Sequence, residues 1–448
     1  MKKTFSTLIR SATLAFSALA LTTSVAGAQQ KLTIVTSFSS ELTDVYKAGF
    51  EKAYPGTTVE IVNKSTNVGV KFLQETARNN TSDVFWASAP DAFEVLKKAG
   101  LLAQHKVSIP GIPEKVSGYP VNDPDGFYTG FALSGYGIMW NTRYVANFKL
   151  DVPKEWSDLT AAKYYGHIGT SSPARSGTTH LTIETILQGE GWEKGWEQIK
   201  LISGNAKTIT ERSFGVPDGV NSGAFGIGLV IDFFGLSSKA SGFPVDFHYP
   251  KVTTLVPASA GVVANAPNAD AAKKFIDFLA SEAGQALLLE PKIMRLPVNP
   301  AAYSKAPKDF PNPFTDTELG RAVSFDIALS EARYNVVNAL FDVMVTYRLD
   351  KLQAAVKAIH DAEKALNGKG SDKAKALIAE ARALIGKVPV TAEKAAEPEF
   401  AAVFTQMRKK PDEVIQGRQA EFEREWDAQV VANYAKAVEL AKQASATQ

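Results

Sequence analysis

The segment of residues 170–180 carries the residue types that an anion site needs. It reads Thr-Ser-Ser-Pro-Ala-Arg-Ser-Gly-Thr-Thr-His, and it lies between a strand-like run, residues 167–170, and an apolar-periodic run, Leu181–Leu187, that predicts a helix. At the start of a helix, free backbone N–H groups and the positive end of the helix dipole point toward a bound anion. Arg175 can add a two-pronged, charge-assisted contact to a phosphate or carboxylate. The competing interpretation is a serine-rich N-cap beside an exposed arginine.

The elements that would position this segment belong to an alternating α/β pattern. Strand-like runs and helix-like runs alternate from residue 32 to residue 100, and this alternation predicts a parallel, doubly wound sheet. In such sheets ligands bind beyond the carboxyl ends of the strands. Those ends are expected at residues 37–40, 65–66 and 86–88, and all three are rich in hydroxyl side chains.

The middle of the chain predicts a second α/β lobe. A long β-prone run with internal glycines, Tyr128–Trp140, is suited to cross from one lobe to the other, and the α/β pattern then repeats over residues 141–250. A further β-like run, Thr253–Val263, is followed by two helix-like segments, residues 269–280 and 281–289. We therefore expect two lobes between which the chain crosses more than once.

Residues 316–448 differ in composition. They are rich in Ala, Glu, Lys and Leu and show helical spacing of apolar residues, as in Val336, Leu340 and Met344. This pattern predicts a packed helical bundle. A coiled-coil interface for a partner is the alternative, although no clean heptad pattern persists.

The N-terminus and the composition restrict the compartment and the chemistry. Residues 1–28 have a basic start, an apolar core and a small-residue cleavage site before Gln29, which predicts a Sec-type signal peptide. The chain has no cysteine, so a lipoprotein anchor, disulfides, cysteine-based metal sites and thiol catalysis are excluded. Three of the positive charges belong to the predicted leader, which leaves one net negative charge on residues 29–448. Nucleic acid and anionic membranes are therefore not indicated as partners.

Four segments resemble a known family. Residues 35–66, 82–102, 170–232 and 256–285 are similar to the extracellular solute-binding proteins of ABC importers, in the branch with iron(III)-, phosphonate-, sugar-phosphate- and phosphoglycerate-binding members. Residues 322–353 resemble the helical extension of the longer, phosphoglycerate-type members.

The resemblance implies a two-lobe periplasmic-binding-protein fold of the type II-like α/β class, with a C-terminal all-α extension. The boundaries we expect are a signal peptide over residues 1–28, lobe 1 over 29–135 and 252–303, lobe 2 over 136–251, and the helical extension over 316–448.

The resemblance also implies which residues face the cleft between the lobes. Serine and threonine hydroxyls and backbone N–H groups would hold a phosphate, which Arg175 would neutralise. Asp232 would accept hydrogen bonds from solute hydroxyls, and three aromatic side chains (Phe38, Trp86 and Phe233) would enclose the carbon skeleton. The alternative roles are a cap of the turn after its strand for Asp232 and a core position for Trp86. The full set of expected solute-binding residues is Ser37, Phe38, Ser39, Trp86, Ser88, Ser172, Arg175, Ser176, Gly177, Thr178, Thr179, Ser213, Phe214, Asp232 and Phe233.

One departure from the family pattern concerns iron. The iron-binding members carry a pair of adjacent tyrosines where this chain has Asp232-Phe233-Phe234, and phenyl rings do not ligate a hard ferric ion. We therefore expect no metal site and no cofactor. Ferric-ion capture, with Asp232, His180 and a tyrosine as ligands, is kept as the alternative function.

The function expected from the sequence is capture without turnover. A small phosphorylated or phosphonate-type anion would be bound by lobe closure and delivered to an inner-membrane ABC permease from the periplasm, where the protein would be soluble and free of a lipid anchor. A membrane sensor that docks on the helical extension is a second partner suggested by family analogy alone. An exported hydrolase is the third hypothesis, and it is disfavoured because the chain has no G-x-S-x-G or H-E-x-x-H motif.

Overall fold

One mixed sheet runs through both lobes. The computed structural model describes residues 30–108, 110–316, 318–406, 408 and 413–447, so the predicted signal peptide lies outside the described residues. Eleven of the described strands form the sheet, and its main path has the order β2-β1-β3-β12-β7-β10-β8-β9. The strands of this sheet are β1 (Gln30–Thr36), β2 (Thr57–Asn63), β3 (Val84–Ala87), β4 (Leu102–Ala103), β7 (Thr129–Asn141), β8 (Ile168–Ser171), β9 (Ala206–Thr210), β10 (Ile227–Ile231), β11 (Val245–His248), β12 (Leu255–Val263) and β13 (Leu296–Pro297). A separate small hairpin pairs β5 (Lys115–Val116) with β6 (Tyr119–Pro120).

The sheet is parallel only at its two ends. Strand β1 pairs in parallel with β2 and β3, and β8 pairs in parallel with β9 and β10. Strands β12 and β7 run antiparallel to their neighbours. The prediction of an α/β fold is confirmed, and so is the parallel pairing expected for residues 32–100, which holds for β1, β2 and β3. The later strands β12 and β7 add antiparallel pairing in the middle of the sheet and link its two ends.

Strand β7 changes partner half-way along its length. Its first part pairs with β12 up to Gly135, opposite Leu255, and its second part pairs with β10 from Tyr136, opposite Ile231. We define lobe 1 by β1, β2, β3, β12 and the first part of β7, and lobe 2 by β8–β11 and the second part of β7. The expected boundary after residue 135 stays a proposal, which this change of partner supports.

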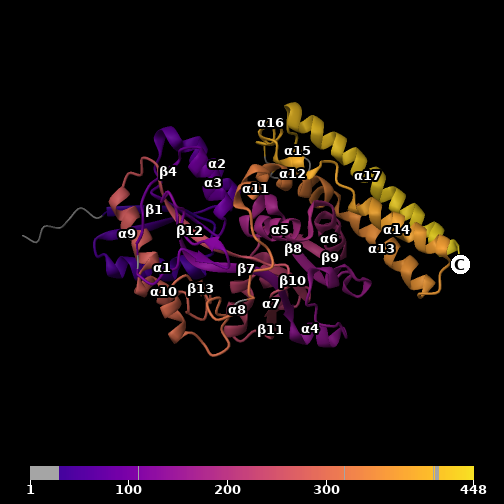
Figure 1. Ribbon diagram of the computed structural model, residues 1–448, viewed down its shortest axis with the longest axis horizontal. Coiled ribbons are helices and arrows are strands. Elements are labelled where there is room, and N and C mark those ends of the chain that lie inside the picture. The colour runs from indigo at the N-terminus through magenta and orange to yellow at the C-terminus, as the bar shows by residue number, and fades with distance from the viewer. Residues whose placement is uncertain (1–29, 109, 317, 407, 409–412, 448) are drawn as a thin grey trace, which may run out of the picture.

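Helices cover both lobes and form the C-terminal extension (Figure 1). Lobe 1 carries α1 (Ser40–Ala53), α2 (Thr66–Thr76), α3 (Pro90–Lys98), α9 (Ala269–Ala280) and α10 (Glu282–Leu287). Lobe 2 carries α4 (Thr142–Asn147), α5 (Gly177–Glu190), α6 (Trp192–Asn205), α7 (Gly215–Ser222) and α8 (Asp232–Ala240). The extension comprises α11 (Ile327–Ala332), α12 (Tyr334–Met344), α13 (Leu349–Leu366), α14 (Asp372–Gly386), α15 (Ala392–Ala396), α16 (Pro398–Ala401) and α17 (Gly417–Ala446). Across the described residues, no helix combines the length and the apolar content needed to cross a membrane.

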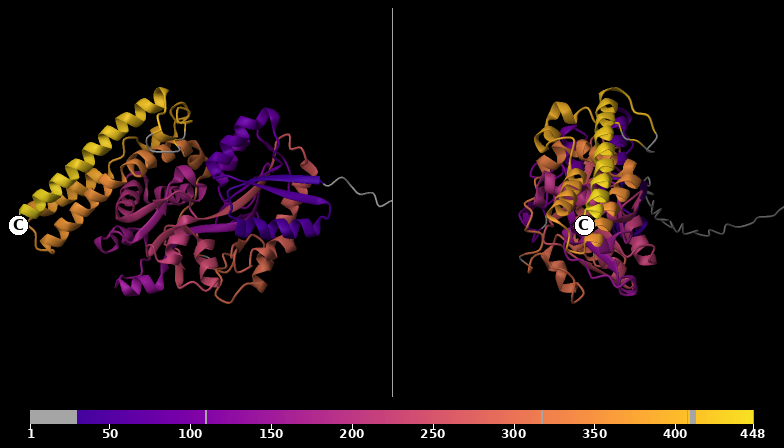
Figure 2. Two further views of the ribbon diagram at one scale, coloured as in Figure 1. Left: turned by 180° about the vertical axis from the view of Figure 1, so that it is seen from behind. Right: turned by 90° about the vertical axis from the view of Figure 1, so that its right-hand side faces the viewer.

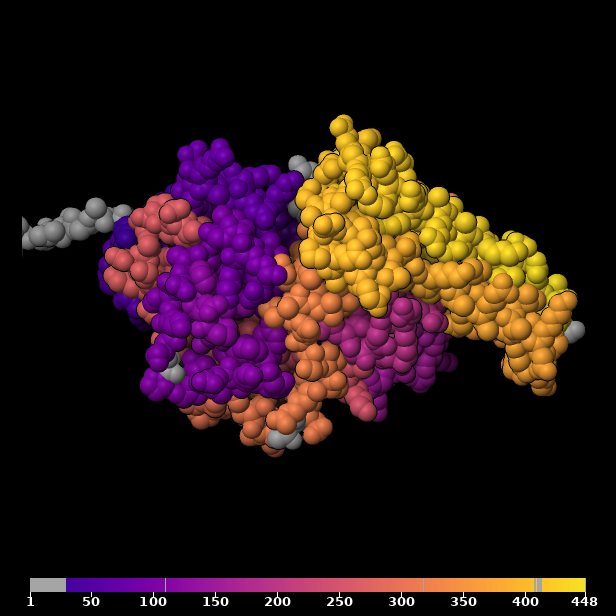
Figure 3. Space-filling view, turned by 45° about the horizontal axis from the view of Figure 1, so that its top comes forward, coloured from indigo at the N-terminus to yellow at the C-terminus, as the bar shows by residue number. Residues whose placement is uncertain are grey.

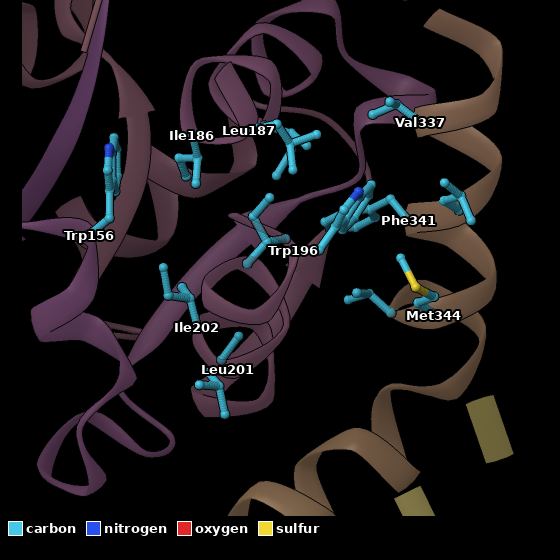
Figure 4. Close-up of a cluster of buried hydrophobic side chains, with 14 of the residues drawn as sticks. Trp156, Ile186, Leu187, Trp196, Leu201, Ile202, Val337, Phe341 and Met344 are labelled. Carbon is cyan, nitrogen blue, oxygen red and sulfur yellow. The ribbon is translucent and has the colours of Figure 1, made fainter. Parts of the chain in front are cut away.

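The extension packs on lobe 2, and its long helices α13, α14 and α17 project away from lobe 1 (Figures 1 and 2). In Figure 4, Val337, Phe341 and Met344 of α12 face a group of lobe 2 side chains that includes Leu187 and Trp196. All five are at most 2% exposed, so each contributes roughly 1.5–3 kcal/mol of burial free energy. The predicted helical bundle is confirmed, and it shares one apolar core with lobe 2.

Candidate functional site

The predicted anion segment forms a strand, a short 3-10 turn and a helix start. Strand β8 ends at Ser171, the turn η4 covers Pro173–Arg175, and α5 begins at Gly177. Ser176 caps α5, since its hydroxyl accepts the Thr179 N–H at 3.2 Å. Of the first N–H groups of α5, which have no acceptor within the helix, that of Thr179 is taken by this cap, and those of Gly177 and Thr178 are left for an anion. The N-cap interpretation and the anion-site interpretation are therefore compatible.

This helix start opens onto a narrow cavity between the lobes. Arginine and hydroxyl side chains dominate its wall. Among the described residues that line it there are three arginines and eight serines or threonines, with no carboxylate, histidine or tyrosine. The lining residues are Ser37, Phe38, Ser39, Leu42, Ser65, Thr66, Ser88, Arg175, Ser176, Thr178, Arg212, Ser213, Phe214, Phe233, Phe234 and Arg295. This wall carries a net positive charge and many hydrogen-bond donors, which is the composition that favours an anion.

Arg295 is a buried cation that sequence reasoning missed. It is 1% exposed, and its Nη1 donates to the Ser88 hydroxyl at 3.0 Å. Its guanidinium carbon lies 4.6 Å from the ring centre of Phe38 and 3.6 Å from that of Phe233. Within the described residues, no carboxylate lies at ion-pair distance from it, and its Nε has no hydrogen-bond partner. Burial lowers the pKa of Arg295 to about 9, and the charge of Asp232 opposes this effect.

Arg212 joins the two lobes across the cavity. It follows β9 in lobe 2, and its guanidinium donates to Asn63 Oδ1 at 2.9 Å and to the Ser37 carbonyl at 3.1 Å, both in lobe 1. It also lies over the Phe214 ring at 4.8 Å. Sequence reasoning placed the neighbouring Ser213 and Phe214 at the cleft but passed over this arginine. Its position two residues after the end of β9 was the available signal.

The signal for Arg295 was weaker. The residue interrupts the apolar run Ile293–Val298, in which a lone arginine must either be buried or break the strand. Ser65, Thr66, Leu42 and Phe234 complete the residues that line the cavity and were not in the predicted set. The strand-end argument had already marked residues 65–66 as one of the hydroxyl-rich ends.

Ten of the fifteen predicted residues line the cavity, and they come from both lobes. They are Ser37, Phe38, Ser39, Ser88, Arg175, Ser176, Thr178, Ser213, Phe214 and Phe233. Their assignment as solute contacts stays a prediction.

Trp86 and Asp232 do not line the cavity. The Trp86 ring is fully buried and packs edge-on against Phe38, 4.9 Å between ring centres, so it supports the wall from behind. Both oxygens of Asp232 are used inside the protein. Oδ2 accepts the Gly135 N–H at 2.7 Å and the Tyr249 hydroxyl at 2.9 Å, and Oδ1 accepts the Phe233 N–H at 2.7 Å. We therefore correct its expected role as an acceptor for solute hydroxyls.

Ser172, Gly177 and Thr179 also lie off the cavity wall. The Ser172 hydroxyl donates to Asp342 of α12 at 2.9 Å, and the Thr179 hydroxyl pairs with that of Ser171. Gly177 has no side chain to contribute, and a Cβ there would meet Ala89 and Thr66 of lobe 1. We call residues 171–179 the anion loop. These three residues belong to the loop but do not form the part of it that lines the cavity.

The fold and this site define a class of protein. Residues 79–328 match the bacterial extracellular solute-binding protein family, and the chain belongs to that family. The protein is thus a solute-binding component of the ABC-transporter type, as the sequence resemblance implied.

Proteins similar to this chain include a phosphoglycerate transport regulatory protein and two binding proteins of known structure. The phosphoglycerate transport regulatory protein PgtC of Salmonella typhimurium is 29% identical over 375 residues, which cover 84% of this chain and 90% of PgtC. The periplasmic binding protein AfuA of Actinobacillus pleuropneumoniae, solved with fructose-6-phosphate, is 19% identical with a TM-score of 0.64, and the match covers 71% of this chain and 99% of AfuA. The apo ferric ion-binding protein A of Pasteurella haemolytica is 15% identical with a TM-score of 0.56, over 70% of this chain and 97% of that protein. At these identities the two solved structures establish a shared fold.

Proposed function

We propose that this protein captures a small phosphorylated organic anion, of the sugar-phosphate or phosphoglycerate class, by closing its lobes around it. The observation that carries the proposal is the wall of the interlobe cavity, where Arg175, Arg212 and Arg295 occur with no described carboxylate. A single negative charge leaves such a wall with excess positive charge. A phosphate monoester, alone or with a carboxylate on the same molecule, balances it better.

Different groups of the cavity wall suit different parts of such a solute. Arg175 and the start of α5 offer a phosphate a charge and free N–H groups. Arg295 on lobe 1 supplies a second, desolvated cation, which suits a carboxylate or a further phosphate oxygen. Phe38 and Phe233 border the cavity with apolar surface for the carbon skeleton. The similarity to PgtC, whose name refers to phosphoglycerate transport, supports this solute class.

Binding without turnover and delivery to a membrane permease complete the proposal. Family membership supports both, as it supports a location outside the cytoplasm, which we take to be the periplasm. A membrane sensor as second partner is supported by the regulatory role in the name of PgtC, whose match extends into the helical extension.

A ligand screen tests the proposal. Thermal shift and titration calorimetry would be measured with phosphoglycerates, hexose phosphates, aminoethylphosphonate, inorganic phosphate, dicarboxylates and ferric citrate. A compound at about 100 times its Kd stabilises the native state by about 2.7 kcal/mol, so a phosphorylated solute is expected to raise Tm visibly. Stabilisation by ferric ion alone, or by no phosphorylated compound, would contradict the proposal.

A further inference from the structure

The first two helices of the extension lie at the junction of the two lobes. Helix α11 packs against α3 of lobe 1, and α12 packs against η4 and α5 of lobe 2. In Figure 3 the extension, coloured orange to yellow, borders both the indigo surface of lobe 1 and the magenta surface of lobe 2. None of the described residues of the extension lines the cavity, so direct contact with a solute does not explain this position.

Helix α12 is firmly attached to lobe 2. The guanidinium of Arg333, which precedes α12, makes two hydrogen bonds to the carboxylate of Glu184 in α5, at 2.9 and 2.8 Å, and both side chains are almost fully buried. Asn338 Oδ1 lies 2.9 Å from Nδ1 of His180, also in α5. Breaking a buried ion pair of this kind is costly, so α12 must move with lobe 2 as one body.

The same helices also hold lobe 1. The Ser330 hydroxyl at α11 donates to Asp91 Oδ2 of α3 at 3.0 Å, and Glu331 forms an ion pair with Lys98 of α3. The Tyr334 hydroxyl donates to Oδ1 of Asn67 at the start of α2. Because α12 moves with lobe 2, these contacts must break when lobe 1 swings away.

The contact through Asn67 reaches the anion loop itself. The Asn67 Nδ2 donates to the Ala174 carbonyl at 2.7 Å, and Ala174 directly precedes Arg175. From the other side, Asp342 of α12 accepts the Ser172 hydroxyl at 2.9 Å. The anion loop is therefore fixed from behind by one residue of the extension directly and by a second through Asn67.

A buried histidine closes the network. Asp91 of lobe 1 lies 3.2 Å from Nε2 of His180 in lobe 2, and both side chains are fully buried. The Tyr334 ring lies against the His180 ring, with 4.2 Å between ring centres. Lobe 1, lobe 2 and the extension thus meet at a single cluster of polar groups behind the anion loop.

We propose that α11 and α12 act as a clasp, in which Ser330 and Tyr334 hold lobe 1 against lobe 2 and Asp342 and Tyr334 position the anion loop. The clasp favours the closed arrangement, so solute binding and the docking of the clasp on lobe 1 strengthen each other. Tyr334 and Asp342 are positioning residues, because neither lines the cavity. The link to solute rests on the proposed function, whereas the link between the clasp and lobe closure does not.

The test uses the full mature chain and two mild variants. Tyr334→Phe removes one hydroxyl and keeps the ring on His180, and Ser330→Ala removes the bond to Asp91. The matched control is Tyr434→Phe, whose buried hydroxyl donates to the Met344 carbonyl at 2.7 Å and stays within the extension. Since the natural chain has no cysteine, spin labels on Lys71→Cys in α2 and Lys239→Cys in α8 report the distance between the lobes without further changes.

Two readouts separate this proposal from the proposed function. In ligand-free protein, both clasp variants are expected to shift the interlobe distances toward longer values, while Tyr434→Phe leaves them as in the parent. With 3-phosphoglycerate as the calorimetric probe, we expect about three- to tenfold weaker binding for the clasp variants and no change for the control, as for the loss of one hydrogen bond. Unchanged distances in both clasp variants would overturn the clasp. If the parent protein binds no phosphorylated probe, the proposed function fails and the distances still decide the clasp.

Discussion

The guanidinium of Arg295 in lobe 1 lies over the ring of Phe233 in lobe 2, with 3.6 Å between the guanidinium carbon and the ring centre. This contact joins the two lobes. It removes water from a cation that has no described carboxylate at ion-pair distance, and a desolvated cation–π contact contributes roughly 2 kcal/mol. The remaining attraction of the charge is available to an anionic solute.

Arg295→Met is expected to remove solute binding without harming the fold. The methionine fills similar apolar space, whereas the lost charge-assisted contact costs about 1.5–3 kcal/mol, or roughly 10- to 150-fold in Kd. The ligand-free protein should lose little thermal stability, because the desolvation cost of an arginine buried without an ionic partner offsets its cation–π contacts and its hydrogen bond to Ser88. Calorimetry measures the loss of affinity, and thermal melts measure the stability of the ligand-free protein. The control is Arg143→Met, at an exposed arginine. A large fall in Tm with unchanged affinity would contradict this role.

Arg175→Ala tests the cation at the anion loop. If Arg175 contacts the solute charge directly, the substitution weakens binding of a phosphorylated compound by about 1.5–3 kcal/mol. Arg175→Lys keeps the charge and loses the two-pronged geometry, so its affinity should fall between those of the parent and the alanine variant. Titration calorimetry measures all three proteins. An affinity that Arg175→Ala leaves unchanged would remove this residue from the site.

Gly177→Ala is expected to obstruct lobe closure. A Cβ at this position would lie 2.7 Å from the Ala89 Cβ and 2.9 Å from the Thr66 hydroxyl, both in lobe 1, so the closed form would be overpacked by roughly 1–3 kcal/mol. The stability of the open form is not reduced, because alanine has a high helix propensity. We expect weaker solute binding at unchanged ligand-free stability. The double variant Gly177→Ala, Ala89→Gly removes the nearest obstacle and should recover affinity, and failure to do so would argue against a steric cause.

Asp232 should give the protein a measurable pH dependence. Burial raises the pKa of Asp232 to about 6, against its hydrogen bonds and the charge of Arg295. The native state therefore holds this proton more tightly than the unfolded chain, whose aspartate pKa is about 3.9. Protonation of Asp232 therefore adds to the free energy of unfolding. This contribution is complete below about pH 4 and is lost as the pH rises through 6.

Urea unfolding of the parent and of Asp232→Asn between pH 4 and 8 isolates this contribution. The unfolding free energy of the asparagine variant minus that of the parent should grow by about 2–3 kcal/mol from pH 4 to pH 7. A constant difference over this range would show that Asp232 titrates normally. Other carboxylates contribute equally to both proteins and cancel.

The local features of the site could be predicted from the sequence. The helix expected over Leu181–Leu187, its serine-rich cap and the hydroxyl-rich strand ends depend on neighbouring residues and on apolar spacing, which the sequence displays directly. The structure starts this helix earlier, at Gly177. The same local patterns predicted the helical character of residues 316–448. The family resemblance then supplied the two lobes that bring such loops together.

The charge of the cavity could not be predicted in this way. The sequence determined the elements and the anion loop with Arg175, because those depend on short-range hydrogen bonding and periodicity. Only the tertiary structure decided that Arg212 and Arg295 line the same cavity as Arg175. It also decided that Asp232 accepts hydrogen bonds from Gly135 and Tyr249, and that α12 packs behind the anion loop. Arg295 meets Ser88 across 207 positions of the chain. Contacts over such separations are fixed by the packing of whole lobes, so a local pattern marks such an arginine as a candidate and does not show what it contacts.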